Sequence, residues 1–149
     1  MKLVNRIISI GEKYHLDLGL YFIISIWIIL NYFLFQYYNY IGITLIIFGY
    51  LIWILGLITL KDAFQIRADA KILIENGIYS KIKHPIYLGG FIIDLGLIIF
   101  TYHTFLFWYL IGYTIIGNLI QLFRIKNEEK ILLDKFGKKY IMYKKNTWF

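Results

Sequence analysis

Two polar stretches border long apolar runs in this chain, and their side chains are of types that can bind and orient small molecules. Residues 77–90 read GIYSKIKHPIYLGG and residues 124–143 read RIKNEEKILLDKFGKKYIMY. Arginine, which opens the second stretch, can grip a carboxylate through two parallel hydrogen bonds. No packing requirement calls for such a pair of segments, so they are the first candidates for a functional site.

Helical spacing gathers several polar side chains onto one stripe. At 100° per residue, positions Asn118, Gln121, Arg124 and Glu128 fall within about 120° of one another, with Glu129 close beside them. The stripe runs about 15 Å from the last apolar run to its polar end. Alternatively, the amides bond to neighbouring helices and the charged residues form an ordinary solvated helix end.

The elements that must position these residues are membrane helices. Of the 149 residues, 60% are hydrophobic, whereas soluble domains contain about half. Four apolar runs have about the length that a helix needs to cross a bilayer: Leu18–Tyr38, Ile41–Leu60, Pro85–Tyr102 and Phe105–Phe123. The sequence therefore predicts an all-α polytopic membrane protein with about four transmembrane helices.

The distribution of positive charge predicts the topology. Three of the 16 Lys and Arg residues precede the first run, five lie between the second and third, and eight follow the fourth. The positive-inside rule then places both termini and the candidate site in the cytoplasm. The net charge of +7 describes one membrane face, suited to anionic lipids, and we expect no nucleic-acid partner. Cysteine is absent and the three histidines are dispersed, so we expect no metal.

We predict a single domain in three parts. Residues 1–17 form an interfacial helix, residues 18–60 a transmembrane hairpin, and residues 61–149 the part that carries the site. The third span should begin at Pro85, since proline tolerates the first helical position. The last helix should leave the membrane and continue into the cytoplasm until Gly137 ends it.

The order of the motifs resembles that of the isoprenylcysteine carboxyl methyltransferase family. Across roughly the second half of the chain, G-x-Y-x-x-x-(R/K)-H-P-x-Y-x-G is followed by an apolar span, R-I-x-x-E-E and F-G-x-x-Y-x-x-Y. Lys83 stands where the family usually has arginine. The resemblance implies an integral membrane enzyme that transfers a methyl group from S-adenosyl-L-methionine to a lipidic or prenylated acceptor. In-line carboxyl O-methylation at the cytoplasmic interface is the favoured chemistry.

The resemblance also implies roles for individual residues. Arg124 would be the catalytic residue, because it would bind and orient the acceptor, and no side chain would act as a dedicated general base. Glu128 and Glu129 would hold cationic or ribose groups of the cofactor. The rest of the cofactor pocket would consist of Lys71, Ile72, Leu73, Ile74, Tyr79, His84, Pro85, Ile86 and Tyr87, with Gln65 a weaker candidate. Asp94, roughly 13 Å into the bilayer, either borders a substrate tunnel or pairs with Asn31 or Asn118, and we leave it outside the site.

Three other functions stay open. Phospholipid amine N-methyltransferases share the paired glutamates and small size. Membrane sterol reductases that use NADPH share the histidine-proline pair, although they typically have asparagine where this chain has Ile86. A non-catalytic assembly or lipid-binding protein would explain the spans and charges but not the two motifs. Tyr140 and Tyr143 either close a lid over the cofactor or anchor the tail in the membrane interface.

Overall fold

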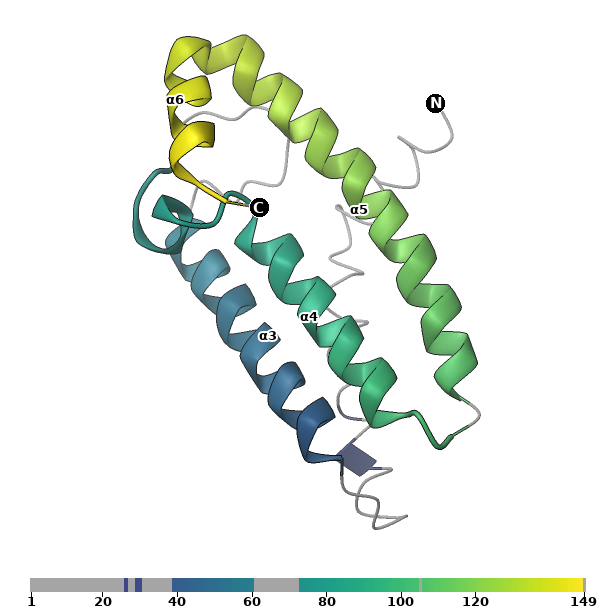
Figure 1. Ribbon diagram of the computed structural model, residues 1–149. Helices are drawn as coiled ribbons and strands as arrows, with labels where there is room; N and C mark the ends of the chain where they lie inside the picture. The colour runs from purple at the N-terminus through teal and green to yellow at the C-terminus, as the bar shows by residue number, and fades with distance from the viewer. Residues whose placement is uncertain (1–25, 27–28, 31–38, 61–72, 105, 149) are drawn as a thin grey trace. The chain divides into compact units, whose positions relative to one another are not determined.

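The computed structural model describes residues 26, 29–30, 39–60, 73–104 and 106–148. The chain divides into two compact units, residues 1–38 and 39–149. The second unit contains the helices α3 (Tyr40–Leu60), η2 (Gly77–Ser80, a 3-10 helix), α4 (Pro85–Phe100), α5 (Leu106–Phe136) and α6 (Lys138–Asn146) (Figure 1). The predicted interfacial helix and most of the predicted first span lie outside the described residues.

The described elements confirm an all-α fold, and two of them are candidate membrane spans. Helices α3 and α5 are long and apolar enough to cross a bilayer, by length and composition, and α4 is a shorter apolar helix. The third predicted span was drawn too long at its end, because α4 stops at Phe100 and not at Tyr102. Thr101 follows as the cap residue, and both its N–H and its hydroxyl donate to the Leu97 carbonyl.

Small residues at a spacing of seven hold α3 and α4 together. A Cβ atom built on Gly49 would lie 2.8 Å from the carbonyl oxygen of Gly89, and one built on Gly96 would lie 2.9 Å from that of Gly42. Real Cβ atoms do not approach this closely, so only glycine permits the contact, as in many membrane helix pairs. The two helices therefore run antiparallel in direct backbone contact (Figure 1).

Both ends of this helix pair are fixed by local interactions. At one end Asn39 caps α3, because its Oδ1 accepts the Gly42 N–H at 3.0 Å, and its Nδ2 donates to the Ile99 carbonyl of α4 at 3.0 Å. At the other end Pro85 is buried at the first position of α4, with His84 as the preceding cap residue. The predicted start of the third span is confirmed. Because the glycine contacts place α4 against α3, they also help to position His84 at the beginning of α4.

Helix α5 extends beyond its apolar part, as predicted, and ends at Phe136. Gly137, with φ of 51°, adopts the left-handed backbone conformation that favours glycine and turns the chain into α6. Helix α6 then packs through Tyr140 and Tyr143, whose rings are buried in one apolar cluster with Leu73, Leu132 and Phe136. The Tyr143 hydroxyl donates to the Tyr79 carbonyl at 2.9 Å. These tyrosines therefore attach α6 to the segment that precedes α4.

The end of the chain pairs with that same segment. The Trp148 N–H donates to the Lys81 carbonyl at 3.0 Å, and the Lys83 N–H donates to the Trp148 carbonyl at 3.3 Å. Ile82 and Trp148 thus form an isolated parallel bridge. The backbone immediately before His84 is held by residues more than 60 positions away in the sequence.

Candidate active site

The polar stripe of α5 meets the first turn of α4 at Tyr87. The Tyr87 hydroxyl donates to Glu128 Oε1 at 2.5 Å, and the guanidinium carbon of Arg124 lies 5.7 Å from the centre of the Tyr87 ring. A cation over a tyrosine ring at this distance is attracted by the negative face of the ring. Three residues that the sequence assigned to the site are therefore brought together by one aromatic side chain.

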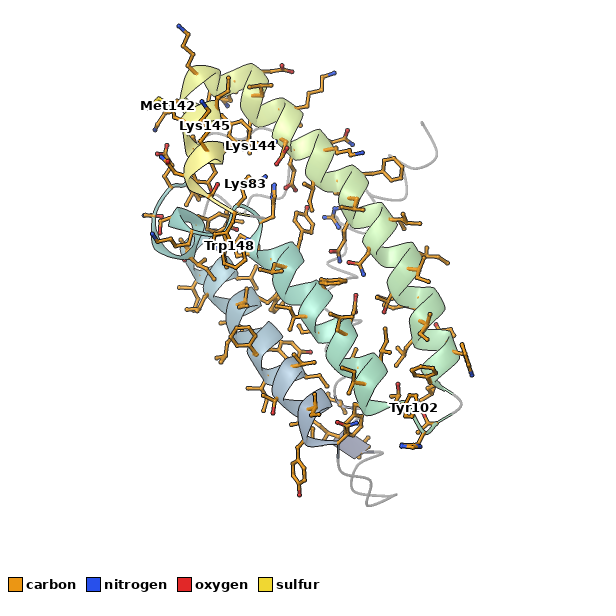
Figure 2. All side chains as sticks on the ribbon, in the orientation of Figure 1. Lys83, Tyr102, Met142, Lys144, Lys145 and Trp148 are labelled. Atoms are coloured by element: carbon orange, nitrogen blue, oxygen red, sulfur yellow. The ribbon has the colours of Figure 1, made fainter. Side chains whose placement is uncertain are left out.

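Glu129 is held between two lysines from different parts of the chain. Its Oε1 lies 2.7 Å from Lys83 Nζ and its Oε2 lies 2.7 Å from Lys144 Nζ, and Figure 2 shows both lysines in the angle between α6 and α5. Burial alone would raise the pKa of Glu129, but the hydrogen bonds from Lys144 and Lys83 outweigh it and lower the pKa to about 2. Glu129 is therefore ionised at neutral pH and compensated within the protein, which suits a residue that organises the site.

His84 is buried beside both glutamates. Its Nε2 lies 3.5 Å from Glu129 Oε1, and its Nδ1 lies 3.8 Å from Glu128 Oε2. Burial lowers the pKa of His84 to about 4, although the hydrogen bond to Glu129 works in the opposite direction. The imidazole is accordingly neutral near pH 7, so neither contact is an ion pair, and the ring offers one N–H donor and one acceptor nitrogen.

We expect the thermal stability of the detergent-purified protein to fall as the pH is lowered from neutral to about 4. The pKa of His84 is about 4 in the folded protein against an ordinary 6.5, so the unfolded chain binds the proton more readily within this window. The stability that depends on neutral His84 is complete above its unfolded pKa and is lost toward its folded pKa. Glu129 adds a loss at lower pH, because its folded pKa of about 2 lies below the ordinary 4.5. Melting temperatures across a pH series measure both effects.

The matched variants for this series are His84→Gln and His103→Gln. A glutamine side chain cannot take up a proton, so the melting temperature of the first variant should change less between pH of about 6.5 and 4.5. His103 is an exposed histidine on the loop after α4, and its replacement should leave the wild-type slope intact. A His84→Gln slope equal to that of the wild type would show that buried His84 does not cause the pH dependence.

Of the other residues assigned to the pocket, some lie near the glutamates and some face α3 instead. Tyr79 is buried, and its pKa is raised by burial and then by the charge of Glu128, so its phenol lies within electrostatic range of the site. Pro85 and Ile86 instead pack toward α3, where their side chains approach a Cβ built on Gly56 to 3.3 and 3.0 Å. Their side chains therefore support α4 from the face next to α3.

The strip from Lys71 to Ile74 is only partly described. Leu73 points into the apolar cluster formed with α6, and Ile74 is half-buried. Lys71 and Ile72 lie outside the described residues, as does Gln65, and their assignment to the cofactor stays a prediction.

Two residues of α6 lie near the site: Lys144, which was not anticipated, and Tyr140, which was expected only as part of a lid or a membrane anchor. Lys144 reaches Glu129 from α6, and the buried Tyr140 hydroxyl has no hydrogen-bond partner among the described residues. Burial and then the charge of Glu129 raise the pKa of Tyr140, which places the hydroxyl close to that carboxylate. Tyr140 and Lys144 are four residues apart, on one face of a helix, and this spacing was the available signal.

Farther along α4, Asp94 is 2% exposed and pairs with α5. Asn118 Nδ2 donates to Asp94 Oδ2 at 3.4 Å and to the Thr114 carbonyl at 2.8 Å. The pairing with Asn118 that the sequence left open is therefore present. The polar stripe meets α4 at two levels, because Asn118 contacts Asp94 whereas Arg124 and Glu128 meet Tyr87.

The sequence model of the Isoprenylcysteine carboxyl methyltransferase (ICMT) family matches residues 40–134. Two curated relatives are each called "Protein-S-isoprenylcysteine O-methyltransferase". The one from Xenopus laevis is 29% identical over 112 residues, which is 72% of this chain and 38% of the relative. The one from Dictyostelium discoideum is 28% identical over 114 residues, which is 73% of this chain and 47% of the relative.

The chain thus aligns with less than half the length of these curated relatives, and no solved structure matches it significantly. The family match covers α3, η2, α4 and most of α5, including Tyr87, Arg124 and both glutamates, and it ends before α6. On this match, the chain belongs to the isoprenylcysteine carboxyl methyltransferase family, whose members are membrane methyltransferases that use S-adenosyl-L-methionine.

Proposed function

We propose that this protein transfers a methyl group from S-adenosyl-L-methionine to an amphiphilic or isoprenoid acceptor in the membrane, by carboxyl O-methylation. The observation that carries the proposal is the meeting of Arg124, Tyr87 and Glu128 where α5 leaves its apolar part. Family membership and the names of the two curated relatives support the same chemistry. A carboxylate acceptor fits best, since a guanidinium binds this group through two parallel hydrogen bonds.

The residues present fit the proposed cofactor. Its ammonium and ribose hydroxyls need acceptors, and the Glu128 side chain, 48% exposed, is a carboxylate beside neutral His84. The buried Tyr140 hydroxyl lies near Glu129, and the Tyr79 and Tyr87 rings are suited to an aromatic base. When bound, S-adenosyl-L-methionine would supply a methyl group on a positively charged sulfur, so that transfer to a carboxylate gives a methyl ester and S-adenosylhomocysteine.

The protein's own contribution is orientation of the acceptor. A carboxylate is ionised near neutral pH, so no side chain needs to remove a proton from it. Arg124 would hold the carboxylate while the Tyr87 ring, fixed by its hydrogen bond to Glu128, supports the guanidinium. Glu129, held by its two lysines, would keep His84 and α6 in place. Such positioning can account for a large part of a methyl-transfer rate.

The acceptor would reach this site from the bilayer. Apolar side chains cover much of the outer surface of α5, and the exposed fractions of Trp108, Ile115, Ile116, Leu122 and Phe123 all exceed one half. Such a surface suits lipid better than water. The predicted topology, with both termini and the site on the basic cytoplasmic side, belongs to this proposal and can be tested with reporters fused to either terminus.

The proposal predicts which acceptor is labelled. Purified protein in lipid nanodiscs, given S-adenosyl-L-methionine with a labelled methyl group, should label a farnesylated cysteine carboxylate as a base-labile ester. It should leave phosphatidylethanolamine unlabelled. Labelling of the amine alone would replace carboxyl chemistry with phospholipid N-methylation. Calorimetry should detect binding of S-adenosylhomocysteine but no binding of NADPH. Folded protein that binds neither S-adenosylhomocysteine nor the labelled donor would refute methyl transfer.

A further inference from the structure

The apolar parts of α3, α4 and α5 contain one carboxylate, Asp94 of α4. It is almost completely buried, and its Oδ1 has no hydrogen-bond partner among the described residues. Ionisable side chains inside a membrane are costly, and those that persist are usually functional. The unpaired oxygen therefore needs an explanation beyond packing.

A lock between α4 and α5 explains only half of this side chain. Asn118 reaches Asp94 Oδ2 at 3.4 Å, which is long for a hydrogen bond, and its short bond of 2.8 Å goes to Thr114 of its own helix. An amide on α4 could make the same bridge without placing an acidic group in the bilayer. The lock leaves Oδ1 without any role.

Asp94 lies on the same line as the candidate site. It follows Tyr87 by seven residues, which is two helical turns, so both face α5 about 10 Å apart along α4. On α5, Gly117 shares the inward face of Thr114 and Arg124 by helical spacing. A Cβ atom built on Gly117 would meet no described atom within 4 Å. Gly117 directly precedes Asn118, which reaches Asp94, so open space lies beside α5 within one residue of that contact.

We propose that Asp94 accepts a hydrogen bond from a hydroxyl or amide N–H group of the acceptor. This group would lie about 10 Å from the carboxylate held by Arg124. The inference rests on the proposed function and specifies its substrate class: an amphiphile with a carboxylate head and a hydrogen-bond donor partway along its apolar part. A plain hydrocarbon chain would leave Asp94 unpaired and would bind less tightly.

The test compares two fatty acids that differ in one group. Octadecanoic acid and the same acid with a hydroxyl group about 10 Å from its carboxylate are titrated into protein in nanodiscs, without methyl donor, and binding is followed by tryptophan fluorescence. The wild type should bind the hydroxylated acid about tenfold more tightly, as expected for one buried hydrogen bond. Asp94→Leu should bind both acids as the wild type binds the plain one, and Asp94→Asn should keep part of the preference.

The matched control is Thr101→Val, which removes a buried hydroxyl of α4 that is satisfied within its own helix. It should keep the wild-type preference. Two results would make Asp94 a structural contact and overturn the inference. One is a wild type that binds the two acids equally tightly, and the other is an equal loss of affinity for both acids in Asp94→Leu and Asp94→Asn. Binding does not require turnover, so a preference without any methyl transfer would remove the proposed function alone. Methyl transfer without preference would remove only the role of Asp94.

Discussion

Replacing Arg124 with alanine is expected to lower kcat/KM for a carboxylate acceptor by about 10²- to 10³-fold, the usual loss when one oriented donor is removed from a reacting oxygen. The guanidinium lies over the Tyr87 ring, on the stripe that ends at Glu128. Without it, the acceptor carboxylate loses its oriented partner. Affinity for S-adenosylhomocysteine should be nearly unchanged, because the groups proposed to hold the cofactor remain. Initial rates with labelled donor and calorimetry measure the two quantities.

Two further variants separate charge from geometry. Arg124→Lys keeps the positive charge but lacks the planar fork, so its rate should fall between those of the alanine variant and the wild type. Lys126→Ala removes an exposed positive charge two residues along the same helix and should leave both quantities unchanged. Full turnover by Arg124→Ala would refute the role of Arg124. A parallel loss of cofactor affinity would move Arg124 to the cofactor side of the site.

The parts of the site that the sequence predicted are those set by local rules. Pro85 can begin a helix but not continue one, and Gly137 supplies the backbone conformation that ends α5, so both boundaries could be placed. Helical periodicity put Arg124 and Glu128 on one stripe, which the structure brings to Tyr87. These inferences needed no knowledge of how distant segments pack.

The interactions that the sequence did not predict depend on distant segments. Lys144 reaches Glu129 only because α6 folds back after Gly137 and buries Tyr140 and Tyr143. The low pKa of His84 follows from burial, which the histidine-proline motif does not specify. The direction in which Ile86 faces depends on α3. Motif matching identifies such residues as a group. It does not show which of them contact a ligand and which pack against neighbouring helices.

The glycine contact between α3 and α4 is different, because its signal was present in the sequence. Glycine recurs at positions 42, 49 and 56 of one apolar run and at 89 and 96 of another. A repeat of seven keeps the same face toward a partner helix. Hydropathy alone treats glycine as one more residue of an apolar run. It therefore predicts the apolar helices but not that α3 packs against α4.

Replacing Gly49 with alanine is therefore expected to destabilise the protein, by about 1 to 3 kcal/mol if the added methyl group behaves as an overpacked core atom. Its Cβ would lie 2.8 Å from the Gly89 carbonyl oxygen and 2.8 Å from the Ile93 nitrogen, and both are backbone atoms that cannot rotate away. The helices must separate, and α4 carries His84 and Tyr87 with it. The melting temperature and the methyl-transfer rate should fall together.

Gly112→Ala on α5 is the matched control, since a Cβ there meets no described atom within 4 Å. Alanine has the higher helix propensity by about 1 kcal/mol, so this variant should be unchanged or slightly more stable. The same substitution thus has opposite expected signs in two apolar helices, and only the presence of a neighbouring backbone differs. If Gly49→Ala melts at or above the temperature of Gly112→Ala, helix propensity outweighs contact and α3 does not lie against α4 at this point. His84 and Tyr87 would then have to be held in place by α5 and α6 instead.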